Sequence, residues 1–192
     1  QVVAEATFEP GAVSVTSQLQ AVTSAQPQAL VVWSTGAAAA VALKAISQLR
    51  VDLPVATTNG NLTYAFLRRI ADYTPKTLLI AATQDFWWQD SDRPAPAPRL
   101  EAAYHHDYQP RFGGPPDFGP GVAYDAVLVM AQAIEKAGST NAGGIKAALE
   151  KVDGFEGVVG TYHMSADDHR GLTVEDVRMV QAKNGKFTYV GK

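Results

Sequence analysis

The sequence predicts an α/β fold with a mainly parallel, doubly wound sheet. In the first half, short β-rich runs alternate with helical stretches, which is the pattern of βαβ units. The run from Leu30 to Trp33 is apolar throughout and lies between Pro27 and Ser34-Thr35-Gly36, as expected for a strand buried on both faces. The 192 residues are 46% hydrophobic, which is enough to bury the core of one large domain or parts of two and excludes a disordered chain.

Four strands and three helices are expected in the first half. Turns are marked by proline and glycine, as at Pro10-Gly11, and helices by apolar residues at helical spacing. Right-handed crossovers would make the first three strands parallel, with helices on both faces of the sheet. The strands are expected at Val2–Phe8, Leu30–Trp33, Pro54–Thr57 and Thr77–Ala82, and the helices at about Val13–Val22, Ala37–Leu49 and Leu62–Ile70.

The composition changes after Asp85. Trp87-Trp88 and the Pro/Ala-rich stretch that follows predict a linker between two lobes, with the tryptophans packed at the hinge. Gly138 is the expected C-cap of a long helix, and Asn184-Gly185 predicts a two-residue hairpin turn. Helices are expected at about Arg99–Tyr108 and Val122–Ala137, and a third, capped by Thr140 or Asn141, runs to about Val152; strands are expected at Thr161–Met164, Val174–Ala182 and Phe187–Val190.

Composition excludes several classes of function. Lys and Arg number 16 against 19 Asp and Glu, a net charge of -3, and the basic residues form no run, so nucleic acid is not expected as a partner. With no cysteine, the chain can form neither a disulfide nor a cysteine-ligated metal site. The longest apolar run, Ala37 to Leu43, is too short to span a bilayer, and no secretory start is present at Gln1. We therefore expect a soluble chain without its original start.

No catalytic or metal-binding motif stands out. His105 and His106 would point about 100° apart on a helix, so they cannot both ligate one ion. His169 lies beside two aspartates, but no Gly-x-Ser-x-Gly elbow supplies an activated serine. We therefore expect no metal, no organic cofactor and no enzymatic activity. Asn61-Leu62-Thr63 fits the pattern for N-glycosylation.

A set of motifs follows one order along the chain. They are Ala29-Leu30-Val31-Val32-Trp33-Ser34-Thr35-Gly36, Thr58-Asn59-Gly60, Ala123-Tyr124-Asp125-Ala126-Val127, Ala137-Gly138-Ser139-Thr140, Phe155-Glu156-Gly157-Val158-Val159-Gly160 and Asn184-Gly185-Lys186-Phe187. Together they resemble the type I periplasmic solute-binding proteins, in particular the branched-chain-amino-acid-like receptors of ABC importers. The resemblance implies a two-lobed α/β protein of roughly twice this length, of which this chain looks like the C-terminal half.

The implied domains are discontinuous. Residues 1–85 and 171–192 would form the C-terminal lobe, and residues 86–170 would belong to a partial N-terminal lobe whose sheet is mostly missing. The lobes would close on a small-molecule solute without making or breaking a bond. The implied partners are that solute, the membrane permease of an ABC importer and the missing N-terminal lobe segment. The implied location is periplasmic, or extracellular and lipid-anchored in a Gram-positive organism.

The resemblance places ligand contacts in two loops and on the other lobe. Trp33 would supply an apolar wall, Thr35 a hydroxyl and Asn59 an amide, beyond the carboxyl ends of strands where α/β sheets bind ligands. Phe118 would supply an aromatic wall from the other lobe. Each has a structural alternative: Thr35 as a helix cap, Asn59-Gly60 as a turn, and Phe118 as packing under a Pro/Gly loop.

Asn59 departs from the family's pattern. Amino-acid receptors of this family usually carry an acidic residue at the aligned position, where it neutralises the ligand's ammonium. Burying an ammonium without a counter-charge costs several kcal/mol. We therefore expect aromatic acids, amides or other neutral or anionic solutes in preference to a zwitterionic amino acid.

Two other classes of function stay open. A sensory or regulatory module of the same fold would signal on closure; a following transmembrane or kinase segment would favour it, whereas a signal peptide or lipoprotein cysteine would favour import. An α/β hydrolase or transferase is disfavoured because the sequence shows no Gly-rich phosphate loop, nucleophile elbow or metal cluster.

Overall fold

The computed structural model describes residues 1–86 and 99–190, which form two compact units. Unit 1 comprises residues 1–82 and 179–190, and unit 2 comprises residues 83–178. The expected linker and the Trp87-Trp88 pair lie outside the described residues. The sequence placed the two crossings next to Asp85 and Gly171; the assignment of the units to two lobes stays a prediction.

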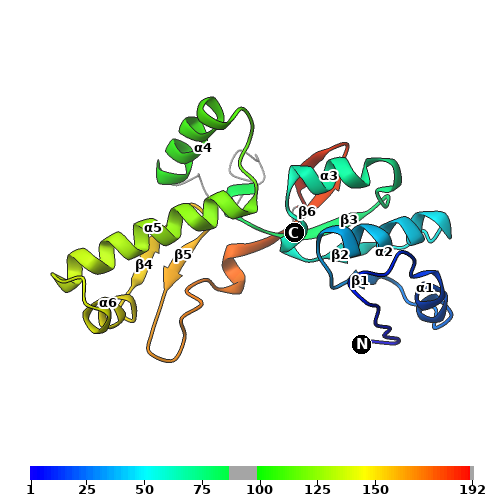
Figure 1. Cartoon of the computed structure of the whole chain (residues 1–192), viewed down its shortest axis with the longest axis horizontal. Helices are drawn as coiled ribbons and strands as arrows, with labels where there is room; N and C mark the ends of the chain where they lie inside the picture. Colours follow the sequence, from blue (N-terminus) through cyan, green and yellow to red (C-terminus); the bar gives the residue numbers. More distant parts are fainter. Residues whose placement is uncertain (87–98, 191–192) are drawn as a thin grey trace. The chain divides into compact units, whose positions relative to one another are not determined.

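Unit 1 is built on a five-stranded sheet with the strand order β1-β2-β3-β6-β7 (Figure 1). The first three strands are parallel neighbours, which confirms the predicted pairing of the second and third expected strands. The hairpin of β6 and β7 turns at Asn184-Gly185 as predicted, and both residues have positive φ. The strands are β1 (Leu30–Val32), β2 (Val55–Thr57), β3 (Leu78–Thr83), β6 (Val177–Lys183) and β7 (Lys186–Tyr189).

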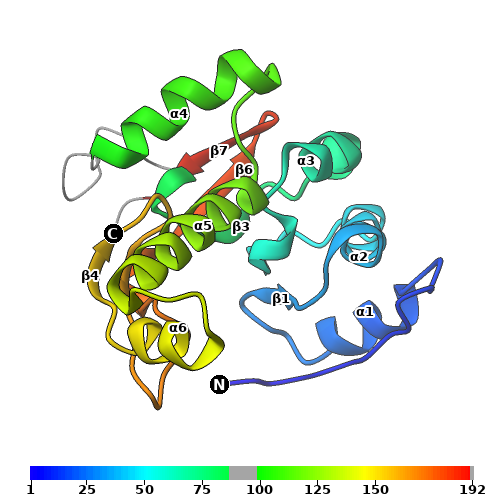
Figure 2. The same cartoon turned by 60° about the vertical axis from the view of Figure 1, so that its left-hand side comes forward.

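One face of this sheet carries the core of unit 1. The helices α1 (Thr16–Thr23), α2 (Gly36–Gln48) and α3 (Tyr64–Ile70) lie in a row, with α2 in contact with both others (Figure 2). Alternate strand residues such as Val55 and Ile80 are fully buried, whereas Val31, on the opposite face, is 68% exposed. The sequence predicted helices on both faces. Because the order β1-β2-β3 runs without reversal, successive crossovers keep α2 and α3 on one face.

The predicted strand Val2–Phe8 is wrong. Residues 1–9 form no strand and pair with none of the described strands. Val2 is 80% exposed, so its apolar side chain has no face to pack against. An apolar run becomes a strand only where a neighbouring edge accepts its hydrogen bonds, and none of the described strands does so here.

In its described residues, unit 2 combines three α-helices with a two-stranded antiparallel sheet of β4 (Asp153–Glu156) and β5 (Thr161–His163). Its core consists of Val129, Val152, Val159 and Tyr162, against which Leu149, Phe155, Met164 and Leu172 pack. The helix α5 lies beside α6 in Figures 1 and 2. The helices are α4 (Arg99–Phe112), α5 (Phe118–Ala137) and α6 (Ala142–Leu149).

Helix ends in unit 2 follow the predicted capping residues. Gly138 adopts a left-handed conformation after α5, which confirms it as the C-cap. The Asn141 side chain accepts a hydrogen bond from the Gly144 N–H at 2.7 Å, so Asn141 and not Thr140 is the N-cap of α6. The strand β4 was not expected, and α5 begins one turn before the predicted Val122.

Candidate ligand-binding loops

Two loops of unit 1 leave the same edge of the sheet. The loop of residues 33–35 follows β1, and the loop of residues 58–63 follows β2. Because β1 and β2 are parallel neighbours, their carboxyl ends lie side by side. This edge is where ligands bind in open α/β sheets. We call these segments the β1 loop and the β2 loop.

The Asn61 side chain joins the two loops. Its Oδ1 accepts the Gly36 N–H at 2.8 Å, and its Nδ2 donates to the Ser34 carbonyl and to Thr57 Oγ1, both at 2.8 Å. Thr57 Oγ1 in turn donates to the Val32 carbonyl at 2.9 Å. Asn61 is fully buried. A neutral amide therefore carries all three links without placing a charge in the core.

The predicted contact residues stand at the surface of these loops. Trp33 is 84% exposed, so its indole ring is accessible at the surface of the β1 loop. Thr35 occupies the N-cap of α2 but makes no side-chain capping bond, so the helix-cap alternative for its hydroxyl is not seen. Asn59 begins a short 3₁₀ turn (Asn59–Asn61), and its side chain is exposed.

Gly60 brings the tips of the two loops into contact. A Cβ at Gly60 would lie 2.6 Å from the Cγ2 of Thr35, so the close approach requires glycine or a shift of Thr35. Unit 1 thus places Trp33, Thr35 and Asn59 on adjoining loops. Phe118 belongs to unit 2, where it is the first residue of α5 and is half-buried.

In unit 2, a buried carboxylate binds the turn between β4 and β5. Asp125 on α5 accepts the backbone N–H groups of Val158 and Val159 at 2.7 and 2.9 Å, and the Tyr162 hydroxyl at 3.1 Å. Asp125 is fully buried. Burial raises its pKa, and the three hydrogen bonds oppose that rise.

A second buried carboxyl lies at the crossover into unit 2. Asp85 follows β3, accepts the Thr83 hydroxyl at 2.7 Å and is 3% exposed. Burial raises its pKa to about 7; the Thr83 bond opposes the rise, and the charges of Glu101 and Asp125 add to it. Asp85 is therefore partly protonated near neutral pH.

The histidines do not form a site. The His105 ring is half-buried, and this burial lowers its pKa to about 4. His106 is exposed and pairs with Asp107 at 3.0 Å, while His169 pairs with Glu150 at 3.2 Å. Within residues 1–86 and 99–190, no three His, Asp or Glu side chains gather in a metal-binding arrangement. None of the helices described is both long enough and apolar enough to cross a membrane.

Comparison with known proteins identifies the family. A family model described as "Periplasmic binding protein" matches residues 1–186. The chain belongs to this family of periplasmic binding proteins. A search of curated proteins found no match.

Solved structures share the fold of this periplasmic binding protein chain. An extracellular ligand-binding receptor from Rhodopseudomonas palustris HaA2 has a TM-score of 0.83 at 22% identity, over 95% of this chain and 53% of that one. The leucine binding protein LivK from Thermotoga maritima MSB8 has a TM-score of 0.80 at 19% identity, over 96% and 49%. LivJ from Streptococcus pneumoniae, the substrate binding protein of a branched-chain amino acid transporter solved with isoleucine, has a TM-score of 0.77 at 22% identity, over 96% and 51%.

The chain spans about half the length of these structures, as it does for a type 1 periplasmic binding protein from Bordetella pertussis, where it covers 51%. At these identities the likeness shows a fold, that of the type I periplasmic binding proteins, and confirms the mainly parallel α/β class that the sequence predicts.

Proposed function

We propose that the chain is part of an extracytoplasmic solute-binding protein that delivers a small organic solute to an ABC importer. The observation that carries the proposal is the pair of loops at the carboxyl edge of the unit 1 sheet. They offer an apolar wall at Trp33, a free hydroxyl position at Thr35 and an amide at Asn59. Membership of the periplasmic binding protein family supports the same function. Binding in such a protein is passive, so no catalytic role is assigned to these residues.

The proposed protein includes a longer N-terminal lobe than unit 2 supplies. Between Phe118 and Ile134 of α5, Asp125 is the only charged residue, and it is buried. Val127 and Met130 on this helix are nevertheless exposed. A helix that is apolar on all sides is normally covered on all sides. We therefore propose that a segment of a longer protein covers this face, with unit 2 in the N-terminal lobe and unit 1 in the C-terminal lobe.

The proposed solute has no free α-ammonium. Asn59 offers an amide, which donates and accepts hydrogen bonds but cannot neutralise a cation. Trp33 presents an indole on which an aromatic ring can stack. Aromatic carboxylates and amides fit this pair better than leucine or isoleucine, the ligands named for LivK and LivJ. Phe118 is proposed as a second aromatic wall contributed by unit 2.

A thermal-shift screen of the complete protein against benzoate, benzamide, L-leucine and L-isoleucine tests the solute class. We expect stabilisation by the aromatic probes and a smaller or no shift with the amino acids. Strong stabilisation by the branched-chain amino acids with none by the aromatic probes would reject the class.

Asn59→Asp tests the site. The new carboxylate would repel a bound anion and weaken benzoate binding by roughly 1 to 3 kcal/mol, as measured by calorimetry. Asn184→Asp makes the same charge change in the exposed hairpin of unit 1 and serves as the control. Equal losses in both variants would show that Asn59 does not contact the solute.

A further inference from the structure

We propose that Asn61 is a positioning residue that couples the β1 loop to the β2 loop and so fixes Trp33 and Thr35 relative to Asn59 for solute binding. This inference rests on the proposed function, because it concerns the same two loops. Because the Asn61 side chain is fully buried, the proposal assigns it no direct contact with the solute.

The hydrogen bonds of Asn61 leave one possible orientation for its amide. The Gly36 N–H can only donate, so it must face Oδ1. The Ser34 carbonyl can only accept, so it must face Nδ2. Thr57 Oγ1 gives its proton to the Val32 carbonyl and therefore accepts from the same Nδ2. Neither aspartate nor leucine can reproduce this set, because an ionised carboxylate has no donor and leucine has no polar atom.

On the β1 side, the amide bonds reach the backbone that carries Trp33 and Thr35. Ser34 lies between these two residues, and its carbonyl accepts the Asn61 bond and a second bond, at 3.3 Å, from Thr58 Oγ1. Gly36 has a φ of +60°, a conformation that L side chains rarely adopt, and its N–H is the first of α2. Asn61 therefore holds the loop at the point where the chain turns into the helix.

On the β2 side, Asn61 is joined rigidly to Asn59. Both belong to one 3₁₀ turn, in which the Asn61 N–H donates to the Thr58 carbonyl at 3.0 Å and the Leu62 N–H donates to the Asn59 carbonyl at 2.9 Å. A movement of the Asn61 side chain is thus transmitted to Asn59 through one turn of backbone. The Asn61 amide supplies two of the hydrogen bonds that join the loops, to Gly36 and Ser34, and Thr58 Oγ1 supplies a weaker one at 3.3 Å; loss of the amide is expected to loosen the coupling.

The first test needs no solute. Asn61→Ala is compared with Ile70→Val or Ile70→Ala, whichever matches its loss of thermal stability; Ile70 is fully buried at the far end of α3 in the same unit. Amide hydrogen exchange of residues 33–36 is measured for the full chain. We expect at least a tenfold faster exchange at Gly36 in Asn61→Ala and no selective change in the Ile70 variant. Equal exchange in the two variants would overturn the coupling.

The second test measures affinity of the complete protein for benzoate and L-leucine. We expect Asn61→Ala and Asn61→Asp to weaken binding of the solute that the parent takes by about tenfold or more, with less than a twofold change in the Ile70 variant. If Trp33→Ala loses affinity while Asn61→Ala keeps it, the positioning role is overturned and the proposed site stands. If Trp33→Ala and Asn61→Ala both keep the parent's affinity although hydrogen exchange at Gly36 has risen, the proposed site fails, and the positioning role fails with it. The hydrogen-exchange test shows whether Asn61 couples the two loops, and its result does not depend on which solute the parent binds.

Discussion

In unit 1 a buried asparagine holds two neighbouring loops, whereas in unit 2 a buried aspartate holds one turn to a helix. Each side chain is fully buried and makes three hydrogen bonds. Asn61 meets both donors and acceptors, which suits an amide, while Asp125 meets donors only, which suits a carboxylate. The partner groups thus dictate which residue is used. The consequence is that the link in unit 2, Asp125, is titratable, whereas Asn61 in the unit 1 loops is not.

Removal of the Asp125 carboxylate is expected to have the largest effect on stability. Asp125→Ala leaves the Val158 and Val159 N–H groups and the Tyr162 hydroxyl buried without their acceptor, and should lower the free energy of unfolding by about 3 to 5 kcal/mol. Urea denaturation measures the change. Glu135→Gln, at an exposed position on the same helix, should change stability by less than about 0.5 kcal/mol. Similar losses of stability in both variants would contradict the stabilising role of the hydrogen bonds to Asp125.

The next prediction concerns the pH dependence of stability that the buried Asp85 carboxyl gives to unit 2. Because burial raises the pKa of Asp85 to about 7, its protonated form stabilises the fold at low pH, and this stability is lost as pH rises from about 4 to about 7. Asp85→Asn keeps the neutral form and an acceptor for Thr83. Relative to the parent, it should gain roughly 1 to 3 kcal/mol between pH 5 and pH 8.

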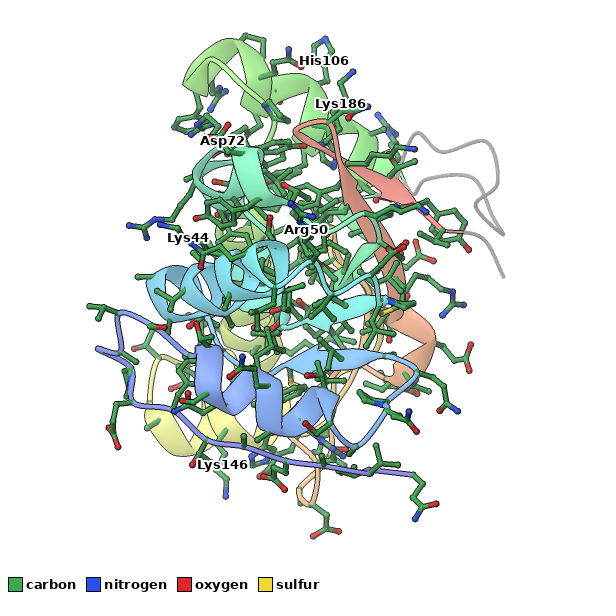
Figure 3. The ribbon with its side chains drawn as sticks, turned by 90° about the vertical axis from the view of Figure 1, so that its right-hand side faces the viewer. Lys44, Arg50, Asp72, His106, Lys146 and Lys186 are labelled. Atoms are coloured by element: carbon green, nitrogen blue, oxygen red, sulfur yellow. The ribbon has the colours of Figure 1, made fainter. Side chains whose placement is uncertain are left out.

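The comparison of parent and variant is needed because His105 opposes this trend. Burial lowers the pKa of His105 to about 4, so its contribution to stability is lost as pH falls from about 6.5 to 4. The difference between the two denaturation curves removes the contribution that His105 makes to both proteins and leaves that of Asp85 with its interactions with Glu101 and Asp125. Asp72→Asn, at the exposed Asp72 of unit 1 labelled in Figure 3, is the control for loss of a surface carboxylate. A constant difference for Asp85→Asn would contradict the assignment.

Glycine substitutions compare how tightly the turns of the two units are packed. A Cβ at Gly157 would lie 2.7 Å from the Cγ of Asp125 and 2.8 Å from the Tyr162 ring, both of them held in the buried network. Gly157→Ala should cost about 2 to 3 kcal/mol. Gly60→Ala meets only the Thr35 methyl group, which can rotate away, and should cost less than about 1 kcal/mol. Equal costs, measured by thermal denaturation, would show that both turns are equally constrained.

The sequence predicts local features of both units. It does not reveal the hydrogen bonds that join residues far apart in the chain. The parallel strands β1 and β2 and the Asn184-Gly185 hairpin were predicted because their signals lie within a few residues. The strand Val2–Phe8 was wrong because strand formation depends on a partner that the pattern does not contain. Asn61 suggested only a glycosylation motif, yet its amide is buried and bonded to Gly36, 25 residues away. Asp125 likewise bonds to groups 33 to 37 residues away, which no local spacing reveals.

The smallest expected change in stability concerns Thr35, and it bears on why the β1 loop has its sequence. Thr35 and Thr63 both occupy N-cap positions of unit 1 helices, but only Thr63 uses its side chain there, accepting the Phe66 N–H at 3.1 Å. Thr63→Ala should therefore cost about 1 kcal/mol, and Thr35→Ala should cost no more than a few tenths. Because the Thr35 hydroxyl makes no capping hydrogen bond to the helix, it can bond to a solute. Calorimetry with benzoate should accordingly show weaker binding for Thr35→Ala and unchanged binding for Thr63→Ala, and the opposite ranking would make Thr35 a structural residue only.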